Sequence, residues 1–146
     1  MHTSNNDELN QEIIEHLMHP KNYGEITPAN GIGMGYDAKT QEFVVFYILV
    51  NDSQLDNVGY ATNGCQDTVV LGSMFTEMIK NDTLENANRA CELMRQQISN
   101  ASAKQQACAD MVLSAYEAAY YNYTHHQNEA MHKIAINQSC STEELS

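Results

Sequence analysis

The hydrophobic and polar positions of the chain follow two different periods, and these periods predict its elements. Apolar residues at helical spacing between Asp7 and Met18 predict a short amphipathic helix that stops before Pro20. The apolar run Phe43–Val50, the turn residues after it and a second segment around Val58–Thr62 predict a β-hairpin. A helix is therefore followed by a sheet.

The second half of the chain changes to a helical period throughout. Asp67 favours the start of one helix, and Asp82 with Glu85 three residues later favours the start of another. The apolar stripes of the three predicted helices are Val70–Met78, Leu84–Ile98 and Cys108–Ala119. This order predicts an α+β fold, in which helices pack on one face of a small antiparallel sheet of about three strands.

Two stretches have no clear period. Residues 19–41 hold both prolines and four of the seven glycines, including Gly31, Gly33 and Gly35, which predicts a loop or extended passage rather than the interior of an element. Beyond His125 the sequence is rich in His, Asn, Gln, Ser and Glu. We therefore predict one domain over residues 1–124 and a mobile or loosely docked tail over residues 125–146.

The net charge of the chain limits the kinds of partner that it can bind. Seven Lys and Arg residues against 19 Asp and Glu residues give a formal net charge of −12, which argues against binding to nucleic acid. The chain has no apolar stretch of the roughly 18 residues that would span a membrane, and its first residues do not form a signal peptide. We expect a cytoplasmic protein without a membrane partner.

The four cysteines lie far apart in the sequence, and a reducing compartment argues against a disulfide framework. Cys65, where strand passes into helix, is either a small packing residue or a thiolate that the helix N-terminus favours. Cys108 is either a core residue or a metal-binding or persulfide-accepting thiolate in the first turns of its helix. Cys91 lies inside an apolar stripe and is predicted to be core. Cys140 lies in the tail, and by default we predict no functional role for it.

Several short motifs together carry a family likeness from about Leu9 to Tyr123. They are Glu12-Ile13-Ile14-Glu15-His16, His19-Pro20-Lys21-Asn22-Tyr23-Gly24, Asn63-Gly64-Cys65 and the helical segment from Phe75 to Ala87. In these motifs, and in the spacing from Cys65 to Cys108, the chain resembles the U-type iron–sulfur cluster assembly scaffolds, the family of IscU, SufU and the NifU N-terminal domain. The resemblance implies an IscU/SufE-like fold and identifies a divergent member.

The resemblance also implies a set of site residues. The family's loop G-x-G-x-x-G-x-P-x-C-G-D matches Gly31–Glu42 without a gap, with Thr40 at its first cysteine and Glu42 at its aspartate. Cys65 and Cys108 match the other two cysteines. These matches imply that Cys65 and Cys108 bind iron or a [2Fe–2S] cluster with Glu42 as a further metal ligand, with zinc as the alternative metal. Cys140, a tail histidine or a partner chain is left to supply a fourth ligand.

The function implied is a scaffold that transiently binds iron, a [2Fe–2S] cluster or persulfide sulfur and has a cysteine desulfurase as partner. We expect no enzyme, because the sequence has no paired catalytic carboxylates, no Ser/His/Asp grouping and no phosphate loop. The segment Ala101–Cys108 stands where the family has L-P-P-x-K-x-H-C, which puts chaperone docking and the family's histidine ligand in doubt. The missing thiolate at Thr40 leaves two alternatives open: a non-assembling paralogue that binds or regulates the desulfurase system, or a zinc-stabilised fold. A homodimer also remains open.

Overall fold

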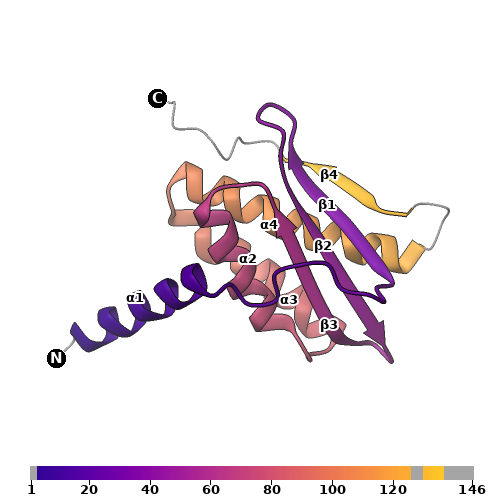
Figure 1. Cartoon of the computed structure of the whole chain (residues 1–146), viewed down its shortest axis with the longest axis horizontal. Coiled ribbons are helices and arrows are strands. Elements are labelled where there is room, and N and C mark those ends of the chain that lie inside the picture. Colours follow the sequence, from indigo (N-terminus) through magenta and orange to yellow (C-terminus); the bar gives the residue numbers. More distant parts are fainter. Residues whose placement is uncertain (1–2, 126–129, 137–146) are drawn as a thin grey trace.

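Three helices cover one face of a four-stranded sheet, and a fourth helix lies beside them (Figure 1). The computed structural model describes residues 3–125 and 130–136. The helices are α1 (Thr3–Met18), α2 (Gln66–Ile79), α3 (Leu84–Gln97) and α4 (Ala103–His125), with a 3-10 turn at Ile98–Asn100. The strands are β1 (Gly31–Asp37), β2 (Glu42–Asn51), β3 (Gln54–Thr62) and β4 (His132–Ala135), in the order β3-β2-β1-β4. The predicted α+β class is confirmed, and none of the described helices is long and apolar enough to cross a membrane.

The predicted hairpin is the centre of the sheet. Strands β2 and β3 pair antiparallel with Phe46 opposite Tyr60, and the turn between them places Asp52 and Ser53 at positive φ. Alternate residues of β2 point into the core, which explains the long apolar run in the sequence. These buried residues are Val44, Phe46, Ile48 and Val50.

The glycine-rich passage is a strand, not the predicted loop. Strand β1 pairs antiparallel with β2 along its whole length, and its three glycines face α4. A Cβ added to Gly33 would lie 2.1 Å from the backbone nitrogen of Ala119, and one added to Gly35 would lie 2.4 Å from the carbonyl oxygen of Met111. The glycines therefore allow α4 to pack directly against the backbone of β1. The composition resembled that of a loop because close packing and turns both require glycine.

The sheet has one more strand than predicted, and it is mixed rather than purely antiparallel. Strand β4 pairs parallel with β1, with His132 opposite Gly33 and Ile134 opposite Gly35. It lies in the region that the sequence predicted to be a mobile or loosely docked tail, whose remaining residues fall largely outside the described ranges. A four-residue strand with only two apolar side chains is too short for its period to be read from the sequence.

Helix α2 buries a different face from the one that its apolar stripe predicted. Of that stripe only Phe75 is buried, whereas Met78 is 49% exposed. Gly72 lies under the ring of Tyr60, with an added Cβ 2.4 Å from Cε2, so small and hydroxyl residues fill this interface instead. Three other apolar residues of α2, Val70, Leu71 and Met74, line a groove of about 380 Å³ together with Ile13 and Leu17 of α1.

Candidate metal or cluster site

Cys65 lies at the junction that the sequence predicted, directly before α2. It is the N-cap residue of that helix, and its carbonyl oxygen accepts hydrogen bonds from the backbone nitrogens of Thr68 and Val69. Asn63 fixes the approach to this junction: its Oδ1 accepts from the nitrogen of Phe43 at 2.8 Å, and its Nδ2 donates to the oxygen of Gln41 at 3.2 Å. The start of α2 is thereby tied to the start of β2.

The fold brings Cys65 and Cys108 together, as their matched positions implied. Their Sγ atoms lie 3.8 Å apart, with Cys65 half-buried and Cys108 fully buried in the second turn of α4. Two thiolates bound to one tetrahedral metal at about 2.3 Å have sulfurs about 3.8 Å apart, so the separation fits one edge of such a site. Cys65 is a free thiol, whereas Cys108 is disulfide-bonded to a residue other than Cys65, although the sequence argued against disulfides. Metal binding by Cys108 therefore requires its reduction.

A shallow cleft gives access to the sulfur of Cys65. Its volume is about 370 Å³, and it is lined by Cys65, Gln66, Asp67 and Lys104. Lys104 lines this cleft together with the carboxylate of Asp67. The family motif did not point to Lys104, because Lys104 stands one position before the lysine of the L-P-P-x-K segment.

Thr40 and Glu42 lie in the turn between β1 and β2. Thr40 Oγ1 donates to Glu42 Oε1 at 3.3 Å and accepts from the backbone nitrogen of Glu42 at 3.2 Å. Asp37, which is only 3% exposed, holds the same turn by accepting from the nitrogens of Lys39 and Thr40. The spacing Asp37-x-Lys39-Thr40 is the signal of such an Asx turn, which the sequence analysis did not use.

The structure does not place Glu42 together with the two cysteines. Glu42 lines another pocket, of about 450 Å³, with Asp37, Phe43 and Lys133 among its neighbours. Within residues 3–125 and 130–136, no group of three or more His, Cys, Asp or Glu side chains is arranged to hold a metal ion. The part of the site within these ranges is therefore a pair of sulfurs, and the ligand role of Glu42 stays a prediction.

A comparison with known protein families shows to which family the chain belongs. The family of NifU-like N-terminal domains matches residues 8–130. The chain belongs to this family. The NifU-like chain is 25% identical over 113 residues to the iron–sulfur cluster assembly scaffold proteins IscU 1 and IscU 2 of Archaeoglobus fulgidus, covering 77% of its own length and 74% of theirs. It is 30% identical over 82 residues to the scaffold protein IscU of Aquifex aeolicus, covering 55% of this chain and 52% of that protein.

Solved structures share the fold of this NifU-like chain. The N-terminal part of a NifU-like protein from Brucella abortus superposes with a TM-score of 0.66 over 80% of this chain and 94% of that one, at 11% identity. A putative scaffold protein for the SUF system from Fervidobacterium islandicum superposes with a TM-score of 0.61 over 73% and 92% of the two chains, at 17% identity. The predicted IscU-like architecture is confirmed by these likenesses.

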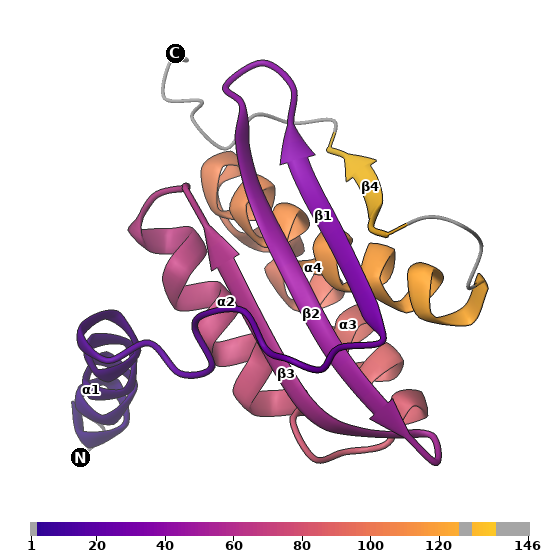
Figure 2. The ribbon, with the colours of Figure 1, turned by 45° about the vertical axis from the view of Figure 1, so that its right-hand side comes forward.

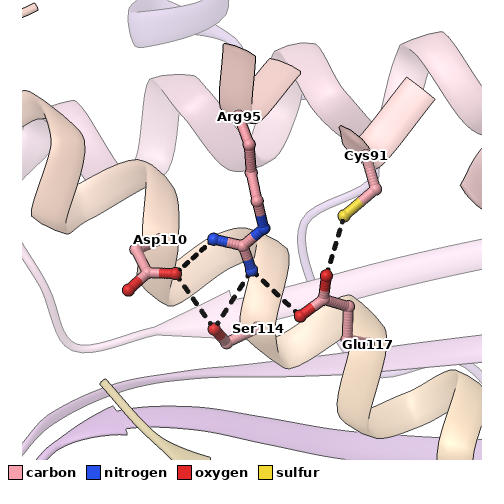
Figure 3. Close-up of polar contacts among 5 residues, drawn as sticks. All are labelled: Cys91, Arg95, Asp110, Ser114 and Glu117. Carbon is pink, nitrogen blue, oxygen red and sulfur yellow. Dashed lines mark hydrogen bonds and ion pairs between the residues drawn. The ribbon is translucent and has the colours of Figure 1, made fainter. Parts of the chain in front are cut away.

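Cys91 of the NifU-like chain lies away from this site. Cys91 is buried in the interface of α3 and α4, where its thiol donates to Glu117 Oε2 at 3.5 Å (Figure 3). Burial, together with the charge of Glu117, raises the pKa of Cys91 to about 12. The prediction that Cys91 is a core residue is confirmed.

The remaining candidate ligands lie at the other end of α4 or outside the described residues. The rings of His125 and His132 both stack on Tyr121, with centroids 3.7 Å and 4.2 Å from it. They join the end of α4 to β4 rather than the cysteine pair. His126 and Cys140 lie outside the described residues.

Proposed function

We propose that this NifU-like chain is an iron–sulfur cluster assembly scaffold, in which Cys65 and Cys108 bind iron, a [2Fe–2S] unit or persulfide sulfur for transfer to another protein. The observation that supports it most directly is the 3.8 Å separation of the two Sγ atoms, at the positions that match two of the family's cysteines. Relatives of the chain carry the name of cluster assembly scaffold, which agrees with this cargo. Glu42, in the turn between β1 and β2, is proposed as a further, oxygen ligand that joins the two sulfurs when the cargo binds.

The two sulfurs differ in ways that suit a transient site. Cys65 is half-buried and faces the cleft, so it is the sulfur that a donor can reach first. It is also the N-cap residue of α2, at the positive end of the helix dipole. Cys108 is fully buried and is held by the packing of α4, so it provides a fixed second anchor. Cargo bound by one half-buried and one fully buried thiolate can leave through the cleft.

Anaerobic reconstitution tests this function. The reduced full-length chain is incubated with a cysteine desulfurase, cysteine and ferrous iron, and the visible charge-transfer absorption is recorded. We expect bands for the wild type and for the control Cys91→Ala, and a loss of these bands for Cys65→Ser and Cys108→Ser. The absence of these bands from the wild type would overturn the proposal. A Glu42→Gln spectrum identical to that of the wild type would show that Glu42 is not a ligand.

A second candidate is a protein that binds the desulfurase without assembling clusters. Thr40 at the position of the family's first cysteine favours it, as does the apolar groove between α1 and α2, which offers a surface to a partner. Pull-down of a desulfurase by a chain that fails reconstitution would support this reading. Metal analysis after anaerobic purification, with the melting temperature before and after chelation, tests for a structural zinc.

A further inference from the structure

We propose that Arg95 is a positioning residue for the sulfur pair: its ion pairs with α4 hold Cys108 at the rotation about the helix axis that faces Cys65. This inference rests on the proposed function and adds to it a residue that is not itself a ligand. The side chain of Arg95 crosses from α3 to α4, where Nη1 donates to Asp110 Oδ1 and Nη2 donates to Glu117 Oε1 at 2.9 Å (Figure 3). The bridge reaches α4 two residues after Cys108.

Helix α4 is held against the sheet along one line of residues. Cβ atoms added to the glycines of β1 would meet Met111, Ala115 and Ala119, which follow one another every four residues along the helix. Figure 2 shows α4 behind β1, on the side of the sheet that carries α2 and α3. This contact sets the distance of the helix from the strand. A helix that touches its neighbour along one line can still roll about that line.

Arg95 contacts a second line of residues on the same helix. Its partners Asp110, Ser114 and Glu117 are spaced by four and three residues, so they share one face of α4. Ser114 Oγ also donates to Asp110 Oδ1 at 3.2 Å, which joins two of these partners. At about 100° for each residue, this face points about 130° away from the face that touches β1. Contacts on two faces so far apart prevent the roll that one face alone permits.

The interface next to the Arg95–Asp110 pair is open rather than close-packed. A hollow of about 250 Å³ lies there, between the end of α3 and the start of α4. The residues that line it are Arg95, Ile98, Ser99, Gln106 and Asp110. Gln106 Nε2 donates across it to the carbonyl oxygens of Ser99 and Ala101, both at 2.9 Å. Polar contacts therefore set the rotation of α4 near Cys108, and the ion pair is the charged one among them.

A small roll of α4 would move the sulfur of Cys108 out of the geometry that a metal needs. A sulfur about 5 Å from the helix axis shifts by about 0.9 Å for a roll of about 10°. Metal–ligand distances are expected to stay within about 0.2 Å of their usual values. Cys65 does not depend on Arg95 in this way, because it caps α2, and Asn63 ties that junction to β2. The separation of the two sulfurs therefore depends on the rotation of α4.

Cobalt binding measures the geometry of the sulfur pair without any cluster chemistry. The reduced, metal-free full chain is titrated anaerobically with Co²⁺ against a competing chelator, and the visible ligand-field bands, which report tetrahedral geometry, are recorded. We expect Arg95→Met, which removes the guanidinium but keeps much of the side chain, to weaken Co²⁺ binding about tenfold and to lower these bands. Arg95→Lys keeps the charge without the fork that reaches both carboxylates, so its loss should be about threefold.

The two carboxylates that Arg95 contacts provide a matched pair of variants. Asp110→Asn and Glu117→Gln each remove one ion pair, but Asp110 lies two residues from Cys108 and Glu117 lies nine residues from it. We expect Asp110→Asn to weaken Co²⁺ binding about fivefold and Glu117→Gln to weaken it less than about twofold. Arg95→Met with Asp110→Asn should lose no more than Arg95→Met alone, because both act through one contact. Equal losses in the two carboxylate variants would contradict a role through Cys108.

A control variant separates positioning from a general loss of stability. Ile79→Val removes one buried methylene at the end of α2 that lies away from Cys65, and it destabilises the fold without touching α3 or its ion pairs. We expect it to bind Co²⁺ like the wild type. If Ile79→Val weakened binding as much as Arg95→Met, the positioning role would be overturned.

The outcomes distinguish this inference from the function on which it rests. If Cys65→Ser and Cys108→Ser lose Co²⁺ while Arg95→Met binds it like the wild type, the positioning role is overturned and the scaffold proposal stands. If the wild type binds no Co²⁺, both are overturned. Losses in Arg95→Met and Asp110→Asn alongside those of the two serine variants support both.

Discussion

Two sulfur environments lie against helix α4, and they differ in charge and exposure. At one end Cys108 of α4 faces the half-buried Cys65, beside a cleft that contains Lys104. In the middle Cys91 of α3 faces Glu117 of α4, within a network in which Arg95 also pairs with Asp110 (Figure 3). The first pair of thiols is the one for which we propose metal binding, whereas the buried thiol of Cys91 beside a carboxylate keeps its proton. The fold thus separates the proposed binding cysteines, at the start of α2 and in α4, from a packing cysteine in α3.

The largest expected effect is on the reactivity of Cys91. With a pKa of about 12, roughly one Cys91 in ten thousand is a thiolate at pH 8, against about one in ten for a thiol of pKa 9.0. We expect alkylation by iodoacetamide to be about a thousandfold slower at Cys91 in the folded chain than in the denatured chain. Peptide mass spectrometry of timed samples measures this ratio. Equal rates in the two states would contradict the difference between the two environments, and Glu117→Gln should raise the folded-state rate.

The next effect concerns the close contact that positions Cys108. Gly33→Ala places a methyl group against the backbone of α4, where no flexible side chain can move aside. We expect a loss of about 3 kcal/mol in the free energy of unfolding, together with weaker metal binding by the cysteine pair. Gly64→Ala is the matched control, because its added Cβ would lie 3.1 to 3.3 Å from side-chain atoms of Thr68 and Thr62 rather than against backbone. Urea denaturation of both variants tests this, and equal stabilities would contradict it.

A smaller effect concerns the proposed binding end. Thr40→Cys adds a thiol at the position where the family has its first cysteine. We expect this variant to bind Co²⁺ about tenfold more tightly than the wild type in an anaerobic titration of the reduced chain against a competing chelator, because a third thiolate is added to Cys65 and Cys108. Thr40→Ser adds no thiol and is the control. An equal gain in the serine variant would show that something other than sulfur is responsible.

The smallest effect belongs to the network around Cys91. Arg95→Ala leaves Asp110 and Glu117 without their cation, and these partly exposed ion pairs are worth about 1 kcal/mol once solvent screening is considered. Arg89→Ala, which breaks an exposed pair with Glu85 on the same helix, should cost less than about 0.5 kcal/mol. Thermal unfolding of the two variants gives the comparison. A larger loss in Arg89→Ala would contradict it.

The sequence predicted the elements whose period is long and regular. The hairpin of β2 and β3 and the helices after it follow directly from apolar spacing, and Cys65 falls at the strand–helix junction as expected. Strand β1 was misjudged because its core-facing positions are glycines, which carry no hydrophobic signal. The buried face of α2 was misjudged because Gly72 and Ser73 occupy it, and only the approach of Tyr60 explains them.

The candidate site was predictable only where it depends on local position. Cys65 and Cys108 meet because two helices begin at the same end of the sheet, which their matched positions already implied. The separation of Glu42 from the sulfurs depends on how the turn between β1 and β2 folds around Asp37. The spacing of residues in the sequence does not predict this fold of the turn. The parallel pairing of β4 is likewise a tertiary choice, since four residues carry too little pattern to state a direction.

The glycine positions of β1 also limit how the length of α4 can change. Each glycine contacts a particular turn of the helix, so the helix cannot slide along the strand without a clash. Insertion of a single residue between Cys108 and Met111 would rotate Cys108 by about 100° around the helix axis and turn its sulfur away from Cys65. Insertions and deletions in this half of α4 should therefore be rejected much more strongly than substitutions, even at exposed positions.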